Sequence, residues 1–121
     1  IQNHILYVAN LGTSMALGSC SKNGKLIRLS NMHDCSNLSE YARIAAGGGR
    51  LYRTKITLKS SAHTFVEGPL RIHPHGLTVT RTLGNYEAKA QNRICNQNLV
   101  LATPEIKYMK TEELNWVMLC S

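Results

Sequence analysis

Residues 4–14 have the sequence HILYVANLGTS, and this stretch is the most informative part of the chain. It begins with residues such as Ile5, Tyr7 and Val8, and β-branched and aromatic residues of this kind favour a strand. Gly12 follows in a turn-like break, where glycine adopts the positive φ angles that other residues avoid. The sequence therefore predicts a strand over residues 4–10 that ends in a turn near Gly12.

Two further strands are expected after this turn. Residues 14–20 form a short apolar stretch, and residues 26–29 form a second one. Between them lies Lys22-Asn23-Gly24-Lys25, whose Asn-Gly pair is typical of a tight hairpin turn. We therefore predict three successive antiparallel strands at the start of the chain.

The spacing of apolar residues becomes helical between Ser36 and Gly49. Ser36 or Asn37 is placed to cap the start of this helix, and Gly47 is placed to end it. The Gly47-Gly48-Gly49 run is not followed by Lys-Ser or Lys-Thr, so we interpret it as a Schellman-type helix end and not as a phosphate-binding loop. The apolar side chains spaced to share one helical face are Leu38, Tyr41, Ala42, Ala45 and Ala46.

The remaining sequence predicts mostly extended structure. Residues 50–75 are polar and contain turn-prone Gly-Pro and His-Pro pairs, which favours short strands in a long excursion. We expect a strand over 76–80, a short helix over 83–90, an extended segment over 99–108 that Pro104 interrupts, and a turn at 111–113. Residues 116–120 are continuously apolar, which is typical of a strand covered on both faces. Strands with one or two helices in this order predict layered α+β structure and not alternating βαβ units.

The composition indicates one globular unit. The chain has 121 residues, of which 43% are hydrophobic and 17% are charged, so it can bury a core and is not compositionally disordered. Its four cysteines are scattered without a CxxC pair, which favours buried free thiols over a zinc ribbon or a disulfide framework. No apolar run approaches the roughly 20 residues of a membrane span, and the N-terminus lacks a signal-peptide layout. We therefore expect an intracellular protein, in the cytoplasm or the nucleus, with no membrane association.

The net charge of +7 favours an acidic partner, such as nucleic acid, an anionic lipid surface or an acidic protein. The basic residues recur singly along the chain and no nucleic-acid-binding motif accompanies them. An ordinary solvated basic surface is therefore the simpler interpretation, and a binding footprint stays open.

Five motifs resemble, in order, those of the PP2C (PPM) family of metal-dependent Ser/Thr protein phosphatases. The first is LYVANLGTS over residues 6–14, which is similar to the family's YVANVGDSRA. The others are Glu40–Ile44 with the following Gly47–Gly49, Gly76–Asn85, Ala102–Ile106 and Trp116–Ser121. The resemblance implies an α+β fold, a PP2C-like sandwich of two antiparallel β-sheets flanked by helices. Residues 1–121 would be a partial domain that lacks the N-terminal and C-terminal portions of the fold.

The departures from the family pattern fall at positions that carry its chemistry. Thr13 and Asn85 stand where the family has aspartates, Met15 replaces an arginine, and Met32 aligns where active members often place a further metal-binding aspartate. Ser121 coincides with the family's final metal-binding aspartate or directly precedes it. Neutral oxygens and a thioether are poor ligands for Mg²⁺ or Mn²⁺. The resemblance thus implies no catalytic residue and no metal ligand in this chain.

Other family positions are retained, and the resemblance implies that they are architectural. Glycines serve turns, and arginines serve structural hydrogen bonds. These retained positions are Gly12, Ser14, Arg43, Arg81 and Gly84.

The other candidate residues carry weaker signals. His73 and His75 could share one side of a strand and bind a metal, but beside Pro74 they are more typical of loop histidines. His4, His33 and His63 have no sequence-local nucleophile and no evident orienting acid. Glu105 is interpreted as a surface or turn carboxylate.

Three functions remain open from the sequence. The first is a catalytically inactive PP2C-like domain that acts as a protein-interaction or regulatory scaffold, with a protein partner, no cofactor, and residues 50–75 as the contact surface. The second is a portion of an active Ser/Thr phosphatase that uses Mg²⁺ or Mn²⁺ and whose metal ligands lie outside this chain. The third is a basic nucleic-acid-binding subunit of a large assembly.

Overall fold

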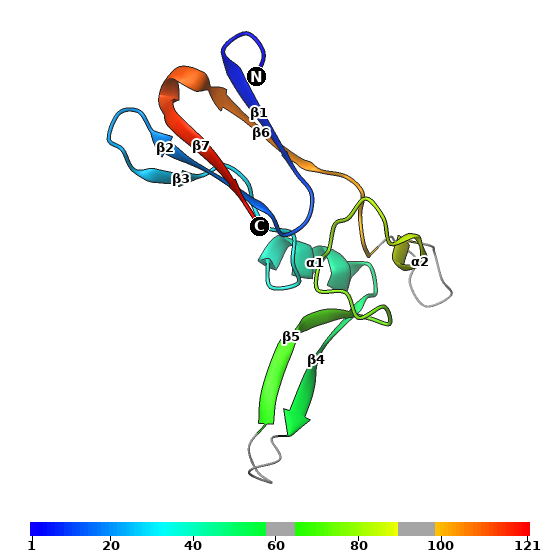
Figure 1. The fold of residues 1–121 in the computed structure, drawn as a ribbon. Helices are drawn as coiled ribbons and strands as arrows, with labels where there is room; N and C mark the ends of the chain where they lie inside the picture. Colours follow the sequence, from blue (N-terminus) through cyan, green and yellow to red (C-terminus); the bar gives the residue numbers. More distant parts are fainter. Residues whose placement is uncertain (58–64, 90–98) are drawn as a thin grey trace.

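The computed structural model describes residues 1–57, 65–89 and 99–121. They form a mixed α+β structure with several antiparallel sheets and few helices, as predicted (Figure 1). The elements are β1 (Ile5–Asn10), β2 (Met15–Cys20), β3 (Leu26–Arg28), α1 (Leu38–Ala46), β4 (Arg50–Thr57), β5 (Phe65–His73), α2 (Tyr86–Lys89), β6 (Glu105–Lys110), the 3₁₀ turn η1 (Thr111–Glu113) and β7 (Leu114–Cys120).

The described strands form three antiparallel sheets, with strand orders β1-β6, β3-β2-β7 and β4-β5. The prediction that three successive strands pair with one another is therefore wrong for the first strand, β1. β1 pairs with β6, from Ile5 opposite Lys110 to Asn10 opposite Glu105, while β2 lies between β3 and β7. The cause is the turn after β1, where Gly12 has a φ of 107° and the chain passes from one sheet to the other.

Two of these sheets face each other. Leu6 and Val8 of β1 lie across from Ile27 and Leu29 and enclose with them a cavity of about 130 Å³. At Gly18 of β2, an added Cβ would lie 2.9 Å from Leu114 Cδ2 and 3.1 Å from Leu29 Cδ1, so a larger residue there would require both leucine side chains to shift. The third sheet, the β4–β5 hairpin, projects from the other end of the molecule, beyond α1 (Figure 1).

Helix α1 has the predicted ends. Asn37 is its N-cap, and its Oδ1 accepts a hydrogen bond from the Ser39 amide at 3.1 Å. At the C-terminus, Gly48 has a φ of 77° and the Gly49 amide donates to the Ile44 carbonyl at 2.9 Å, which is the predicted Schellman geometry.

The buried face of α1 differs from the one that the apolar spacing marks. The helix buries Glu40 and Ile44, whereas Leu38 is 85% exposed and Tyr41 is 47% exposed. Ile44 belongs to a core with Cys35, Ile72, Ala88, Leu99 and Val100. Burial of Glu40 is possible because two arginines reach it, which the spacing of apolar residues does not reveal.

Several predicted strands change extent. Residues 50–75 form two long paired strands, with only residues 58–64 outside the described part, and not a series of short strands. Residues 76–80 make isolated bridges, such as Asp34 with Val79, and no continuous strand. Between residues 99 and 108, the strand begins only after Pro104, which has no amide hydrogen to donate to a ladder.

Strand β7 is longer than predicted and is not covered on both faces by the described residues. Trp116 is 46% exposed and Leu119 is 79% exposed. Helix α2 lies within the predicted 83–90 segment. Cys35 is a buried free thiol as expected, while Cys20 and Cys120 are only partly buried, and Cys95 lies outside the described residues.

Candidate functional site

Two of the substituted family positions, Met15 and Ser121, line one cavity with the retained Ser14. This cavity has a volume of about 370 Å³ and lies at the end of β2 and β7, next to Asn10. Its polar lining consists of a side-chain amide, hydroxyls, a thioether and the Cys120 thiol. Among the described residues, no Asp or Glu side chain lines it.

The other substituted positions lie elsewhere. Thr13 lines a cavity of about 360 Å³ with Asp34 and Arg53. Asn85 lines a cavity of about 430 Å³ and has a φ of 60°, a left-handed conformation that Asn adopts more readily than most residues. Met32 is partly buried, and its carbonyl accepts a hydrogen bond from Asn37 Nδ2 at 2.9 Å. The structure thus brings together only two of the five positions.

The predicted histidine pair is also divided between different surroundings. The His73 ring packs edge-on against Tyr52, with ring centroids 6.2 Å apart, whereas His75 lines the Asn85 cavity. Within residues 1–57, 65–89 and 99–121, no group of three or more His, Cys, Asp or Glu side chains is arranged to hold a metal ion.

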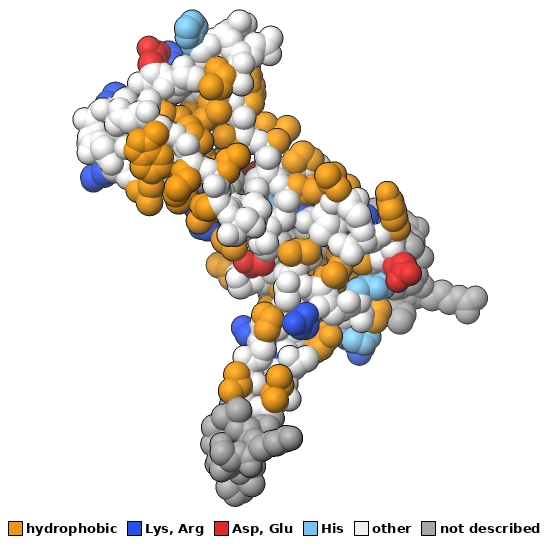
Figure 2. Space-filling model, in the orientation of Figure 1, with side chains coloured by type: hydrophobic (Ala, Val, Ile, Leu, Met, Phe, Trp, Pro, Cys, Tyr) orange, Lys and Arg blue, Asp and Glu red, His pale blue; other side chains and the backbone are white. Residues whose placement is uncertain are grey.

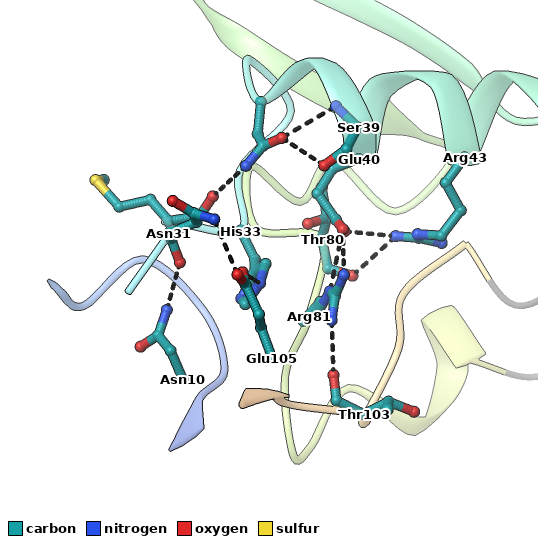
Figure 3. Close-up of polar contacts among 12 residues, drawn as sticks. Asn10, Asn31, His33, Ser39, Glu40, Arg43, Thr80, Arg81, Thr103 and Glu105 are labelled. Carbon is teal, nitrogen blue, oxygen red and sulfur yellow. Dashed lines mark hydrogen bonds and ion pairs between the residues drawn. The ribbon is translucent and has the colours of Figure 1, made fainter. Parts of the chain in front are cut away.

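A buried carboxylate, Glu40, lies at the centre of one cluster of polar contacts (Figure 3). Its side chain is 2% exposed. Arg81 donates to Glu40 Oε1 from Nη2 at 2.6 Å and from Nε at 3.1 Å. Arg43, one turn further along α1, donates from Nη2 to Oε2 at 2.9 Å. Glu40 is therefore held by two guanidinium groups from different parts of the chain.

These arginines also bind backbone carbonyls. Arg81 Nη1 donates to the Thr103 carbonyl at 3.1 Å, and Arg43 Nη2 donates to the Leu99 carbonyl at 3.1 Å. The contacts connect α1, the segment around Arg81 and the segment that leads into β6. The sequence analysis named both arginines and placed Glu40 in a family motif but gave it no role, although its spacing of three residues from Arg43 on a helix was a usable signal.

The pKa of Glu40 reflects two opposing effects. Burial acts to raise it, but the hydrogen bonds from Arg81 and then Arg43 outweigh burial and lower the pKa to about 2. Glu40 is therefore ionised at neutral pH, and its charge is neutralised inside the fold.

A second cluster surrounds His33, whose side chain is 1% exposed. The Gly12 amide donates to His33 Nδ1 at 3.4 Å, so Nε2 carries the proton and faces Glu105 Oε2 at 3.3 Å. Asn31 Nδ2 donates to the other oxygen of Glu105 at 2.9 Å, and Asn10 Nδ2 donates to the Asn31 carbonyl at 2.6 Å. The β1–β6 sheet and the loop before α1 are joined at this cluster.

This second cluster corrects two predictions. Glu105 is not a plain surface or turn carboxylate, because it is partly buried and accepts from two side chains. His33 does have an orienting acid, but it is Glu105, 72 residues away in sequence. No local pattern could have indicated this pair.

All seven acidic residues of the chain lie within the described part, so their positions can be compared with the Met15–Ser121 cavity. Asp34 Oδ1 accepts from the Ser36 amide at 2.8 Å, and Glu67 pairs with Lys55 at 3.4 Å. None of the seven lines that cavity. The remaining acids are Glu40 and Glu105, described above, and the exposed Glu87, Glu112 and Glu113. The groups that this chain contributes there do not suit a hard divalent cation.

None of the helices in the described ranges is long and apolar enough to cross a membrane. A comparison with curated proteins gave no match.

Several solved structures are similar to this chain. A phosphatase from Toxoplasma gondii is 25% identical with a TM-score of 0.60, over 95% of this chain and 26% of that one. A C. elegans sex-determining protein is 23% identical with a TM-score of 0.64, over 97% and 24%. A phosphatase from a pathogenic strain of Toxoplasma gondii is 23% identical with a TM-score of 0.58, over 95% and 30%. The chain therefore spans less than a third of the length of these structures.

A family model matches almost the entire chain. It is the model of Protein phosphatase 2C, and the match covers residues 1–120. This match agrees with the facing antiparallel sheets and with the order of the five sequence motifs. The chain belongs to the protein phosphatase 2C family, of whose domain it is a part.

Proposed function

We propose that this chain is part of a catalytically inactive PP2C domain that acts as a protein-interaction or regulatory scaffold. The observation that carries the proposal is the lining of the Met15–Ser121 cavity, which offers a thioether, hydroxyls, a thiol and an amide but no carboxylate. Two-metal phosphate hydrolysis needs several carboxylates that converge on hard cations. We propose that the full-length protein likewise lacks the carboxylates that would bind metal ions at this cavity.

The arrangement of the acidic residues gives further support. Glu40, which is buried, and Glu105, which is partly buried, are held by arginine, asparagine and histidine side chains within the fold. These internal contacts between side chains support the shape of the domain. A scaffold needs that shape and does not need the metals.

The alternative is an active phosphatase whose carboxylates come from outside this chain. One observation favours it: the chain covers 26% of a Toxoplasma gondii phosphatase to which it is 25% identical. Much of such a domain, and any ligands it holds, would then lie in other segments.

Hydrolysis of p-nitrophenyl phosphate and of a phosphoserine peptide by the full-length protein separates the two functions. The scaffold proposal expects no turnover above buffer with Mn²⁺ or Mg²⁺, and no change when a chelator is added. Turnover that coelutes with the protein on a sizing column and disappears with the chelator would establish the alternative.

A further inference from the structure

The β4–β5 hairpin has two unlike faces. Its register places Leu51 opposite Ile72 and Arg53 opposite Leu70. Ile72 is fully buried, and Leu51 and Leu70 pack against the same core. Because side chains alternate across a strand, the intervening residues lie on the opposite face, which we call the outer face.

Four residues of the outer face form a compact patch. Arg50 lies opposite His73, and Tyr52 lies opposite Arg71. Directly opposed residues have Cβ atoms about 5 Å apart, and the two pairs are separated by about 7 Å along the strands. Two guanidinium groups, an imidazole and a phenol are therefore gathered in one small area.

The patch is held in place before any ligand arrives. The Tyr52 and His73 rings lie 6.2 Å apart in an edge-on contact. Arg71 Nη1 donates to the Gly76 carbonyl at 2.7 Å, and a Cβ added at Gly76 would lie 3.4 Å from the Tyr52 hydroxyl. A preorganised surface loses less conformational entropy when it binds.

The patch carries positive charge that the described residues do not neutralise. None of the ion pairs among them involves Arg50 or Arg71. Glu67, the acidic residue of the hairpin strands, lies on the opposite face, where it pairs with Lys55 at 3.4 Å. Blue and orange side chains lie along the visible part of the described hairpin in Figure 2, and no red one is in view there.

An apolar pair continues the outer face towards the tip. Ile56 lies opposite Val66, and these side chains are 63% and 52% exposed. Between this pair and the patch, Gly68 leaves room for Thr54, because a Cβ at Gly68 would lie 2.5 Å from Thr54 Oγ1. Ile56 is four residues from Tyr52, or about 13 Å along the strand.

We propose that the outer face of the hairpin binds an extended acidic segment of a protein partner. Two carboxylates of that segment contact Arg50 and Arg71, and an apolar side chain about four residues further on contacts Ile56 and Val66. Beyond the patch, the outer face continues with the aliphatic side chains of Ile56 and Val66. Single-stranded nucleic acid would need aromatic side chains there for its bases to stack on, so the outer face favours a peptide over RNA. The inference rests on the proposed scaffold function and names its partner chemistry.

Fluorescence anisotropy with the full-length protein tests this proposal. The probe is a fluorescein-labelled ten-residue peptide with two adjacent glutamates and a leucine four residues beyond them. Arg50→Gln is compared with Arg53→Gln, which removes the same charge from the opposite face of the same strand. We expect Arg50→Gln to weaken binding at least about threefold and Arg53→Gln to leave it unchanged.

Two further comparisons complete the test. Replacing the glutamates of the peptide with glutamines should abolish binding, and Ile56→Ser should weaken binding of the leucine peptide but not of its serine counterpart. Equal losses for Arg50→Gln and Arg53→Gln, or binding of a single-stranded RNA oligomer with no binding of the peptide, would overturn the proposal. Chelator-sensitive hydrolysis would instead overturn the scaffold function, whatever the peptide result.

Discussion

Replacement of Glu40 by glutamine removes the charge from a carboxylate whose side chain is only 2% exposed. Glutamine keeps the size of the side chain but cannot neutralise Arg81, which approaches to 2.6 Å, or Arg43, which approaches to 2.9 Å. Both arginines then remain partly buried without a counter-charge. We expect Glu40→Gln to destabilise the fold strongly.

The magnitude can be worked out in two ways. Removing one partner of a buried ion pair costs about 3–5 kcal/mol. Because Arg81 and Arg43 keep 19% and 25% of their side chains exposed, we reduce this to about 2–4 kcal/mol. The shift of the Glu40 pKa from 4.5 to about 2 corresponds to about 3 kcal/mol of preference for the charged form. Both arguments give a loss of about 3 kcal/mol in the free energy of unfolding for Glu40→Gln.

The same shift predicts how stability depends on pH. Since the pKa of Glu40 is lower in the folded state, the stabilisation is complete above about 4.5 and is lost as the pH falls towards about 2. The Glu40→Gln variant has no charge to titrate there. Its free energy of unfolding should therefore fall less steeply over this range than that of the unchanged protein.

Urea unfolding followed by the fluorescence of Trp116, the one tryptophan of the chain, measures both effects. The control is Glu112→Gln, because Glu112 is 75% exposed and lies 3.8 Å from Lys110. It should change the free energy of unfolding by less than about 0.5 kcal/mol. Equal costs for the two variants, or an unaltered acid dependence in Glu40→Gln, would refute the role assigned to Glu40.

Three other measurements address the helix and the core. Ile44→Ala should cost about 2–5 kcal/mol in thermal unfolding because Ile44 is fully buried, whereas Leu38→Ala on the exposed side of the same helix should cost less than about 1 kcal/mol. Gly48→Ala should cost about 1 kcal/mol, because an added Cβ has open space there but a φ of 77° disfavours any residue other than glycine. Gly84→Ala is the control and should be neutral in the same assay, because Gly84 also has open space and has no positive φ. Cys35 should react with iodoacetamide more slowly than the partly exposed Cys20 and Cys120. Burial, followed by nearby negative charge, raises the pKa of the Cys35 thiol. Equal reaction rates by mass spectrometry would contradict its burial.

Much of the local structure could be predicted. The hairpin turn at Asn23-Gly24, the Asn37 cap and the glycine-rich end of α1 follow from backbone preferences of one or a few residues. The five family motifs also indicate the correct fold. These signals are readable because each depends on neighbours within a few positions of the chain.

The long-range pairs in the polar clusters could not be predicted. His33 and Glu105 are 72 residues apart, and Glu40 and Arg81 are 41 apart, so no periodicity links them. The sequence marked the acidic residues as few but gave no sign of which ones are buried. Burial of a carboxylate depends on donors that the rest of the fold brings to it.

The sequence by itself determined the two ends of α1, the turn at Asn23-Gly24, the family, and the neutral side chains at Thr13, Met15, Met32, Asn85 and Ser121. The tertiary structure alone decided that β1 pairs with β6, that α1 buries Glu40, and that Arg50 and Arg71 share an open face of the hairpin. The physical reason is one of range. Backbone preferences act within a few residues, whereas burial, ion pairing and strand register are settled between segments that only folding brings together.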